Sequence, residues 1–318
     1  MSKGLDMRNK SARNCRITDY LRKLIDLFGV RSRLASLCVS ELYEVLIKNA
    51  EVVEEHIDRW RKIYVALYGR ALARRKFNSR KIGVYYGVKV SPKRLLEFLL
   101  SLHTYYAILV KAITAKILLK DFPLFDKTPS EDLLYEIEGG SIFCDYGILN
   151  FPDDDIFSWY LTVWDARMKG LIKSVYDTVT NNLDIIRHIM DKAALDIFGF
   201  LYQNIIPKDV RHVLGEHYTP PWLAQLILDE VGYKGDPNKR LLEPCCGSFT
   251  FGVFAIKRVL NEREERNILN SIQRNIIGLE VNPLAVLAAK ANFVLTIRHL
   301  LYENINKRKI EIPIYSYD

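Results

Sequence analysis

The sequence predicts an α-helical N-terminal domain followed by an α/β domain built on a parallel sheet. From about residue 17 to residue 206 the apolar residues follow helical periodicity, and glycine is scarce. From Lys239 onward, short apolar segments alternate with helical ones in the order RLLEP, FGVFAIKRVL, NIIGLEV, LAVLAAKANFVLTIRHLL and IEIPIYS. This alternation is typical of parallel strands joined by crossover helices. We therefore predict two domains, over residues 1–206 and 207–318.

The first predicted domain is basic. Residues 1–100 hold 22 Lys and Arg against 10 Asp and Glu, whereas the whole chain has a net charge of +8. Because neutralisation of phosphates supplies most sequence-independent affinity for nucleic acid, this excess favours DNA as a partner. A solvated helix face is the alternative interpretation.

The cysteines and the N-terminal segment indicate the cellular compartment in which we expect the protein. The five cysteines are odd in number and lack CxxC spacing, so neither a disulfide framework nor a metal site is predicted. The polar N-terminus has no apolar segment of signal-peptide length, so we expect a cytoplasmic protein.

Ser91 and Pro92 predict the start of a helix that is apolar nearly all round. A histidine and two lysines interrupt residues 95–119, which favours a buried bundle helix over a membrane span.

Residues 121–155 contain three prolines and three glycines and predict a loop-rich interruption. Asp153, Asp154 and Asp155 close this segment. We interpret them as a helix cap rather than a metal site, because an apolar helical pattern follows at once.

The first motif that indicates chemistry follows the strand predicted at residues 240–242. Glu243 to Phe251 form a loop of small residues before a helix, at the carboxyl end of a strand, where ligands bind in open α/β sheets. Small residues allow the backbone to approach a ligand, and the N–H groups that begin the helix suit a carboxylate.

A second motif ends the next predicted strand. Ile276 to Glu280 are apolar up to Glu280, whose carboxylate is placed to accept hydrogen bonds from ribose hydroxyls. A plain helix-capping acid is the alternative. The separation of Glu243 from Glu280 exceeds the roughly 20 residues typical of dinucleotide folds, which disfavours an NAD enzyme.

A third motif, GEHYTPPWLAQLIL, precedes the sheet. Together with LLEPCCGSFTF and GLEVNPLAVLAAKAN, in this order, it resembles the adenine-N6 DNA methyltransferases of restriction-modification systems. The similarity is greatest to type I modification subunits and fused type IIG enzymes, and it covers about residues 200–318. The resemblance implies a Rossmann-like fold and S-adenosylmethionine as cofactor.

The resemblance also implies which residues bind the cofactor. The Tyr-Thr-Pro element would lie over its methionine part, the loop would wrap the methionine and ribose, and Glu280 would hold the ribose hydroxyls. A final aspartate would contact the adenine amino group. The implied cofactor-binding residues are Tyr218, Thr219, Pro220, Glu243, Pro244, Cys245, Cys246, Gly247, Ser248, Phe251, Glu280, Val281 and Asp318.

Two positions depart from the family pattern. Glu243 replaces the usual aspartate, and Phe249 stands where the pattern has its second glycine. A bulky side chain is costly there if the position needs a positive φ, which would weaken cofactor binding. The alternative is that Phe249 turns into the core of the helical domain.

The family's catalytic tetrad, Asn, Asp or Ser followed by Pro-Pro and an aromatic residue, has no convincing counterpart. Thr219-Pro220-Pro221-Trp222 is similar in form, but threonine is a poor acceptor and these residues belong to the Tyr-Thr-Pro element. No catalytic residue is therefore assigned. We expect an incomplete α/β domain, truncated before the tetrad, with an exposed edge strand near residues 310–315.

The sequence leaves two hypotheses of function. The first is the cofactor-binding part of a DNA adenine-N6 methyltransferase that needs a second polypeptide for the tetrad and the target-recognition region. The second is a non-catalytic DNA-binding or assembly protein derived from such an enzyme. An RNA or protein substrate remains open.

Overall fold

The structure is a computed structural model, and it describes residues 17–74, 79–123, 133–152, 156–192, 196–214, 216–262, 268–302 and 309–316. Asp318 and Asp153 to Asp155 lie outside these residues. A helix over residues 17–28 opens the described chain. The helices that follow are α2 (Arg33–Lys48), α3 (Glu54–Arg74), α4 (Ser79–Val84), η1 (Pro92–Arg94), α5 (Leu95–Asp121), α6 (Leu133–Glu138), α7 (Ser141–Asp145), η2 (Ile156–Val163), α8 (Ala166–Asn181), α9 (Leu183–Lys192) and α10 (Ile197–Ile205).

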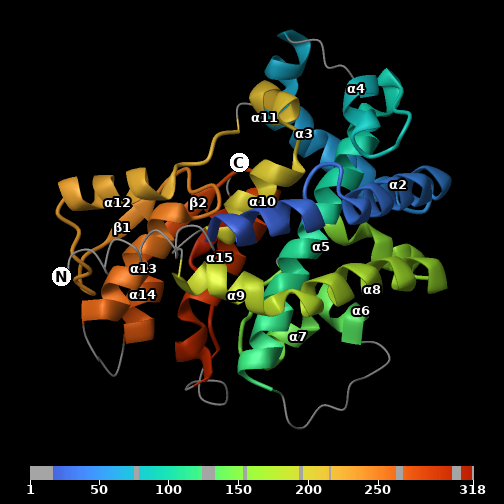
Figure 1. Cartoon of the computed structure of the whole chain (residues 1–318). Helices are drawn as coiled ribbons and strands as arrows, with labels where there is room; N and C mark the ends of the chain where they lie inside the picture. The colour runs from blue at the N-terminus through green and yellow to red at the C-terminus, as the bar shows by residue number, and fades with distance from the viewer. Residues whose placement is uncertain are drawn as a thin grey trace, which may run out of the picture.

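The remaining elements contain the sheet. They are α11 (Lys208–Leu214), α12 (Pro221–Glu230), β1 (Leu241–Glu243), α13 (Thr250–Glu262), α14 (Ile268–Asn275), β2 (Ile276–Glu280), α15 (Pro283–Tyr302) and β3 (Ile314–Ser316). The strands and α12 to α14 lie on one side of the molecule, α2 to α8 lie on the other, and α10 and α15 run between them (Figure 1). The chain is thus mostly helical with a small parallel sheet, as the sequence predicted.

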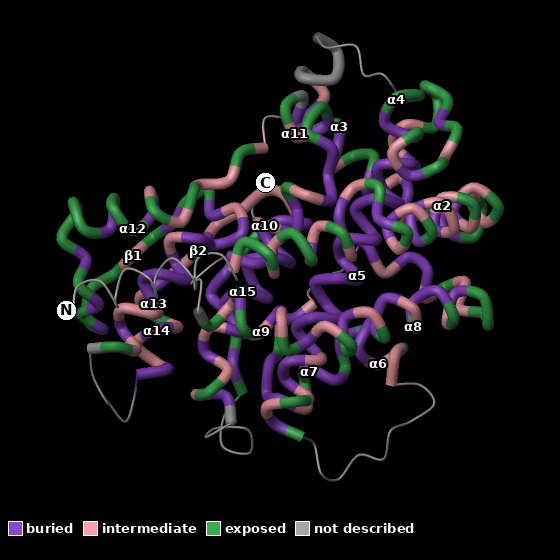
Figure 2. Tube along the Cα trace, viewed as in Figure 1, coloured by how far each residue is buried: buried purple, intermediate pink, exposed green. Residues whose placement is uncertain are grey.

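Helix α5 is the central helix of the larger side. Its residues are buried almost continuously from Glu97 to Leu118, and α2, α8 and α15 pack against it (Figure 2). Its start differs from the prediction, because Ser91 makes no capping hydrogen bond and Pro92 begins the short 3-10 turn η1 instead. The burial of α5 agrees with its all-round apolar pattern.

Two helices are long and apolar enough to cross a membrane by length and composition alone. They span Pro92–Asp121 and Pro283–Leu301, and the most apolar 18 residues of each are 100% and 78% buried, respectively. Burial of this extent is typical of helices in a protein core.

A buried ion pair ties α5 to α6. Lys111 Nζ lies 2.8 Å from Glu138 Oε2, and both side chains are fully buried. The hydroxyls of Tyr160 and Tyr176 donate to the two carboxylate oxygens, the second at 2.6 Å, and Lys111 also contacts Ser158 Oγ at 2.9 Å. Such complete hydrogen bonding is what allows two charges to be buried together.

The sheet has the order β1-β2-β3 with both pairs parallel. Leu241 pairs with Ile276 and Gly278 pairs with Ile314, so α13 and α14 form the first crossover and α15 the second. The described residues before β1 contain no strand. One of them, Ile148, forms an isolated parallel bridge with Ile310, which follows α15 in the sequence.

The edge that we expected to be exposed near residues 310–315 is partly covered. Ile310 N donates to Gly147 O at 2.7 Å, and the Asn150 side chain both accepts from Ile312 N at 2.8 Å and donates to Ile312 O at 3.0 Å. Residues 147–150 therefore satisfy backbone groups of Ile310 and Ile312, just before β3. The prediction missed this cover because it comes from a distant part of the chain.

The two predicted domains share one hydrophobic core. A single cluster of buried side chains runs from Leu24 to Ile314, and α15 packs against both α5 and α10. The predicted boundary at residues 206 and 207 falls between α10 and α11, and it stays a prediction.

We expect Glu138→Gln to lower the free energy of unfolding by about 3–5 kcal/mol, because it leaves the Lys111 ammonium buried without its counter-charge. The double variant Lys111→Met, Glu138→Gln should regain part of that loss, since no charge is then stranded. Urea unfolding of both variants measures the difference. Equal stability of the single and double variants would contradict this account.

Candidate functional site

The loop after β1 lies at the carboxyl ends of two neighbouring parallel strands. The register pairs Glu243 with Gly278, which brings the end of β1 beside the end of β2, where Glu280 stands. Gly247 N donates to Glu280 Oε2 at 2.8 Å. Two motifs that are separate in the sequence therefore meet in the structure, at the position where open α/β sheets bind ligands.

The Glu280 carboxylate accepts three backbone hydrogen bonds. Besides Gly247 N, it accepts from Val281 N at 2.9 Å and Asn282 N at 3.0 Å, both at Oε1. A carboxylate offers about four acceptor positions. One position on Oε2 is therefore open to a hydroxyl donor, and Glu280 is only partly buried.

Tyr218 lies against the loop. A Cβ placed on Gly247 would be 3.9 Å from Tyr218 Cε1, and the Tyr218 ring centre is 5.3 Å from that of Tyr202. Gly247 has φ of +52°, which a glycine adopts without strain. Thr219 belongs to neither a helix nor a strand, Pro220 is the N-cap of α12, and Pro221 is the first residue of that helix.

A polar network next to Tyr218 was not predicted. Glu216 Oε1 accepts from Tyr68 OH at 2.6 Å and from Asn282 Nδ2 at 3.3 Å, and Tyr202 OH donates to Oε2. Asn282 Nδ2 also donates to Tyr68 OH at 3.0 Å. Burial raises the pKa of Glu216, although the hydroxyls of Tyr202 and Tyr68 act against it. No sequence pattern links Tyr68, on α3, to the loop.

Asp196 is a second unpredicted residue of the site. Its carboxylate accepts from Gly199 N at 2.8 Å, which caps α10, and from Asn292 Nδ2 at 2.7 Å, Thr250 Oγ1 at 3.0 Å and Ser248 Oγ. Burial raises the pKa of Asp196, while these hydrogen bonds lower it.

The arrangement around Asp196 places Ser248 inside the protein. The Ser248 side chain is 1% exposed, its hydroxyl faces Asp196, and its carbonyl accepts from Asn292 Nδ2 at 2.8 Å. The predicted role of Ser248 in cofactor binding remains a prediction, and it would require the loop to rearrange or the contact to be indirect.

Glu243 caps the helix that follows the loop. Its Oε2 accepts from Gly252 N at 3.0 Å, and Phe251 N is a second backbone donor to the carboxylate. The amides expected to bind a ligand carboxylate are thus occupied by the chain's own glutamate. Burial raises the pKa of Glu243 to about 8 despite these hydrogen bonds, with the charges of Asp196 and Glu280 adding to the rise.

Phe249 has the positive φ that we considered costly, at +70°, and its side chain is fully buried. Its ring lies against two glycines: a Cβ on Gly252 would be 2.1 Å from Phe249 Cζ, and one on Gly278 would be 2.9 Å from Cε2. The ring also contacts Phe293, at 6.4 Å between centres. Phe249 is therefore packed between α13, β2 and α15, beneath the loop.

The remaining predicted positions fall in different surroundings. Pro244 and Cys245 are exposed on the turn after β1, Cys246 is buried, and Val281 is partly buried. Desolvation raises the pKa of the Cys246 thiol, which keeps it protonated. In the described part of the chain, no group of three or more His, Cys, Asp or Glu side chains is arranged to hold a metal ion.

Comparison with known proteins gives one match. The family model for N-6 DNA methylases matches residues 193–313. This range contains the loop, Glu280, Tyr218, Glu216 and Asp196, whereas Tyr68 lies outside it. Neither a curated protein nor a solved structure matches the chain.

We predict that Phe249→Gly is less destabilising than Phe249→Ala by about 1 kcal/mol, the reverse of the usual order, because glycine relieves the positive φ that alanine keeps. Both variants should lose stability, since Phe→Ala in a core costs about 3–5 kcal/mol. Urea unfolding gives both values, and a more stable alanine variant would show that the backbone is not strained there.

We predict that stability falls as pH rises from about 5 to about 8, and that Glu243→Gln makes this fall shallower. Because the pKa of Glu243 is raised to about 8 in the folded state, the native protein binds a proton in this range that the unfolded chain has lost. The stabilisation is therefore full below the ordinary glutamate pKa and is lost as pH rises through 8. Thermal unfolding at several pH values measures both slopes, and parallel slopes for variant and wild type would refute the assignment.

Proposed function

We propose that residues 193–313, which match the family model for N-6 DNA methylases, bind S-adenosylmethionine at the carboxyl ends of β1 and β2 for adenine-N6 methylation of DNA. The observation that supports this most is the contact between Gly247 N and Glu280 Oε2, which brings the glycine-containing loop to an acid at the end of the adjacent strand. Loops and acids placed in this way hold nucleoside ligands in parallel α/β sheets.

The residues present suit such a ligand in three respects. The open acceptor position on Glu280 is available to a ribose hydroxyl. Gly247 presents backbone without a side chain, so a ligand can approach closely. Tyr218 lies next to this glycine and offers an aromatic face at the edge of the site. The proposed fold of this part is accordingly Rossmann-like, with β1 and β2 as the strands next to the cofactor.

S-adenosylmethionine would supply an electrophilic methyl group bonded to a sulfonium. The chain's own part is then positioning, with Glu280 orienting the nucleoside. Glu216 bonds to Tyr202, whose ring lies against Tyr218, and to Asn282, which directly precedes α15. The carboxyl groups of Glu243 and Glu280 both lie at the loop.

The groups that hold the target adenine are proposed to come from a second polypeptide. The sequence contains no Asn, Asp or Ser before Pro-Pro and an aromatic residue. In the similar Thr219-Pro220-Pro221-Trp222, the two prolines are the N-cap and the first residue of α12, and Trp222 is 66% exposed. A base must be flipped out of the duplex and held for methylation. We propose a restriction-modification role for the assembled enzyme.

A non-catalytic binding or assembly role is the second candidate, because the loop is well satisfied without a ligand. The N–H groups at the start of α13 bond to Glu243, and Glu280 has three of its acceptor positions filled. A loop of this kind would keep its shape as a scaffold.

Isothermal titration of the purified chain with S-adenosylmethionine distinguishes the two. We expect the wild type to bind and Glu280→Ala to bind at least about tenfold more weakly, since the variant cannot form a charge-assisted hydrogen bond with the ribose. Glu230→Ala, on the exposed end of α12, is the matched control and should bind as the wild type does. Thermal unfolding of each variant verifies that it is folded.

Absence of binding by the folded wild type would reject the cofactor proposal and favour the scaffold. With binding established, transfer of a labelled methyl group to duplex DNA tests the rest. We expect transfer only when a polypeptide that carries the catalytic tetrad is added. Transfer by the chain alone would show that its own residues hold the adenine.

A further inference from the structure

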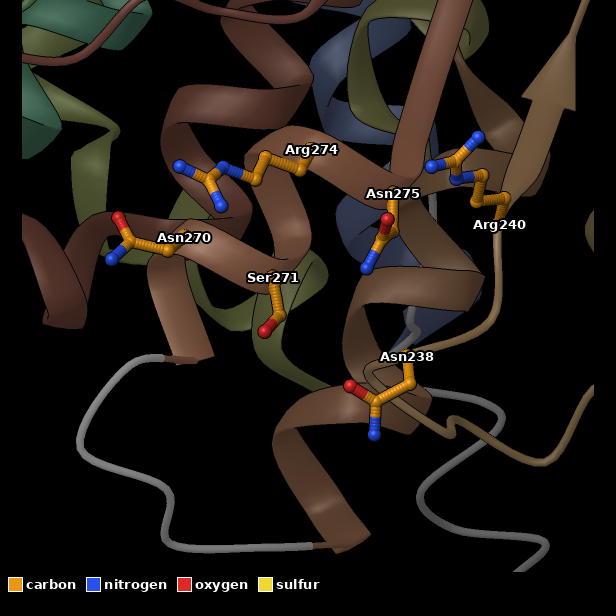
Figure 3. Close-up of a pocket in the computed structure, with 6 residues that line it drawn as sticks. All are labelled: Asn238, Arg240, Asn270, Ser271, Arg274 and Asn275. Carbon is orange, nitrogen blue, oxygen red and sulfur yellow. The ribbon is translucent and has the colours of Figure 1, made fainter.

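A polar depression of about 600 Å³ opens at the amino ends of β1 and β2. Figure 3 shows its lining from two segments, the residues that lead into β1 and the helix α14. The lining residues are Asn238, Arg240, Asn270, Ser271, Arg274 and Asn275. None of them belongs to the site at the opposite, carboxyl ends of the strands.

Helix α14 forms one wall because of its amphipathic pattern. Ile268, Leu269 and Ile272 are buried. Asn270 and Arg274 are four residues apart, as are Ser271 and Asn275, so all four share the other face of the helix.

The second wall is held against the first by the sheet register. Leu241 pairs with Ile276, so the residues just before them, Arg240 and Asn275, are neighbours across the two strands. Asn275 Nδ2 also donates to Pro237 O at 2.7 Å, which ties the segment before β1 to the end of α14. Strand pairing and this hydrogen bond therefore fix the positions of the two walls relative to each other.

The lining carries positive charge without a matching negative charge. It contains two guanidinium groups and no carboxylate, and neither Arg240 nor Arg274 forms an ion pair in the part of the chain that the structure describes. By contrast, Arg258 pairs with Asp229 at 2.9 Å. Two arginines that share a polar depression without counter-charges are suited to a bound anion.

The other lining groups supply further hydrogen bonds. Three carboxamides and one hydroxyl surround the arginines, and Asn270 Oδ1 is buried without a hydrogen-bond partner among the described residues. An unsatisfied buried polar atom costs about 1–3 kcal/mol. A carboxamide can present either its oxygen or its N–H₂ group after rotation, so Asn270 can donate to an oxyanion or accept from a hydroxyl beside it.

We propose that this depression binds a phosphate group through Arg240 and Arg274, with Ser271 and Asn275 as additional donors. The planar guanidinium matches two phosphate oxygens at once, which lysine cannot do. The phosphate belongs either to the DNA backbone or to a small phosphorylated molecule, and both present the same oxyanion. The site lies apart from Glu280, so the proposal does not depend on cofactor binding.

The test compares the double variant Arg240→Gln, Arg274→Gln with a double variant of matched charge, Lys234→Gln, Lys239→Gln. Both control lysines are exposed, lie nearby in the sequence and do not line the depression. Binding of a fluorescent duplex is followed by anisotropy at several salt concentrations. Binding of pyrophosphate is followed by its effect on thermal unfolding. Each variant is first shown to be folded by its own thermal transition.

If the site binds the DNA backbone, the arginine variant should bind DNA severalfold more weakly than the control, with a salt slope smaller by about 0.9 for each phosphate that is no longer neutralised. If the site takes a small phosphorylated molecule, pyrophosphate should stabilise the wild type and the lysine control but not the arginine variant, while DNA binding is unchanged between the two variants. Arginine and lysine variants that behave alike in both assays would overturn the proposal.

Discussion

The buried carboxylate of Asp196 is the constraint on which the site depends. It joins three elements that are far apart in the sequence: the N-terminus of α10, the loop at Ser248 and Thr250, and Asn292 on α15. A buried carboxylate is unfavourable unless it is fully hydrogen-bonded, so each of these donors must be in place for the fold to be stable. The loop shape, the start of α10 and the position of α15 are therefore determined together.

The loop shows how the protein accommodates a residue that local rules disfavour. A phenylalanine at positive φ costs about 1–2 kcal/mol in the backbone, whereas burial of its side chain contributes about 1.5–3 kcal/mol. Phe249 is accommodated because Gly252 and Gly278 leave space for its ring. The backbone strain arises from the residue itself, whereas the packing that offsets it comes from residues distant in the sequence. The sequence pattern alone therefore indicated only the strain.

The two ends of the same strands carry different ionisable groups. At the carboxyl ends, Glu243 and Glu280 lie near Asp196, and burial raises the pKa of Glu243 and Asp196. At the amino ends, Arg240 and Arg274 line a depression without a carboxylate. The cofactor site and the phosphate site that we propose therefore lie at opposite ends of the same strands.

The sequence by itself determined that the chain is mostly helical with a small parallel sheet, that α5 is buried, and that the loop and Glu280 each follow a strand. These follow from local periodicity and from the rule that parallel strands end at one edge. Only the tertiary structure decided the partners of Asp196, Tyr68 and Glu216, the cover over residues 310–312 and the packing of Phe249. Each of these depends on residues that are distant in the chain, and no local pattern records which distant side chains a fold will bring together.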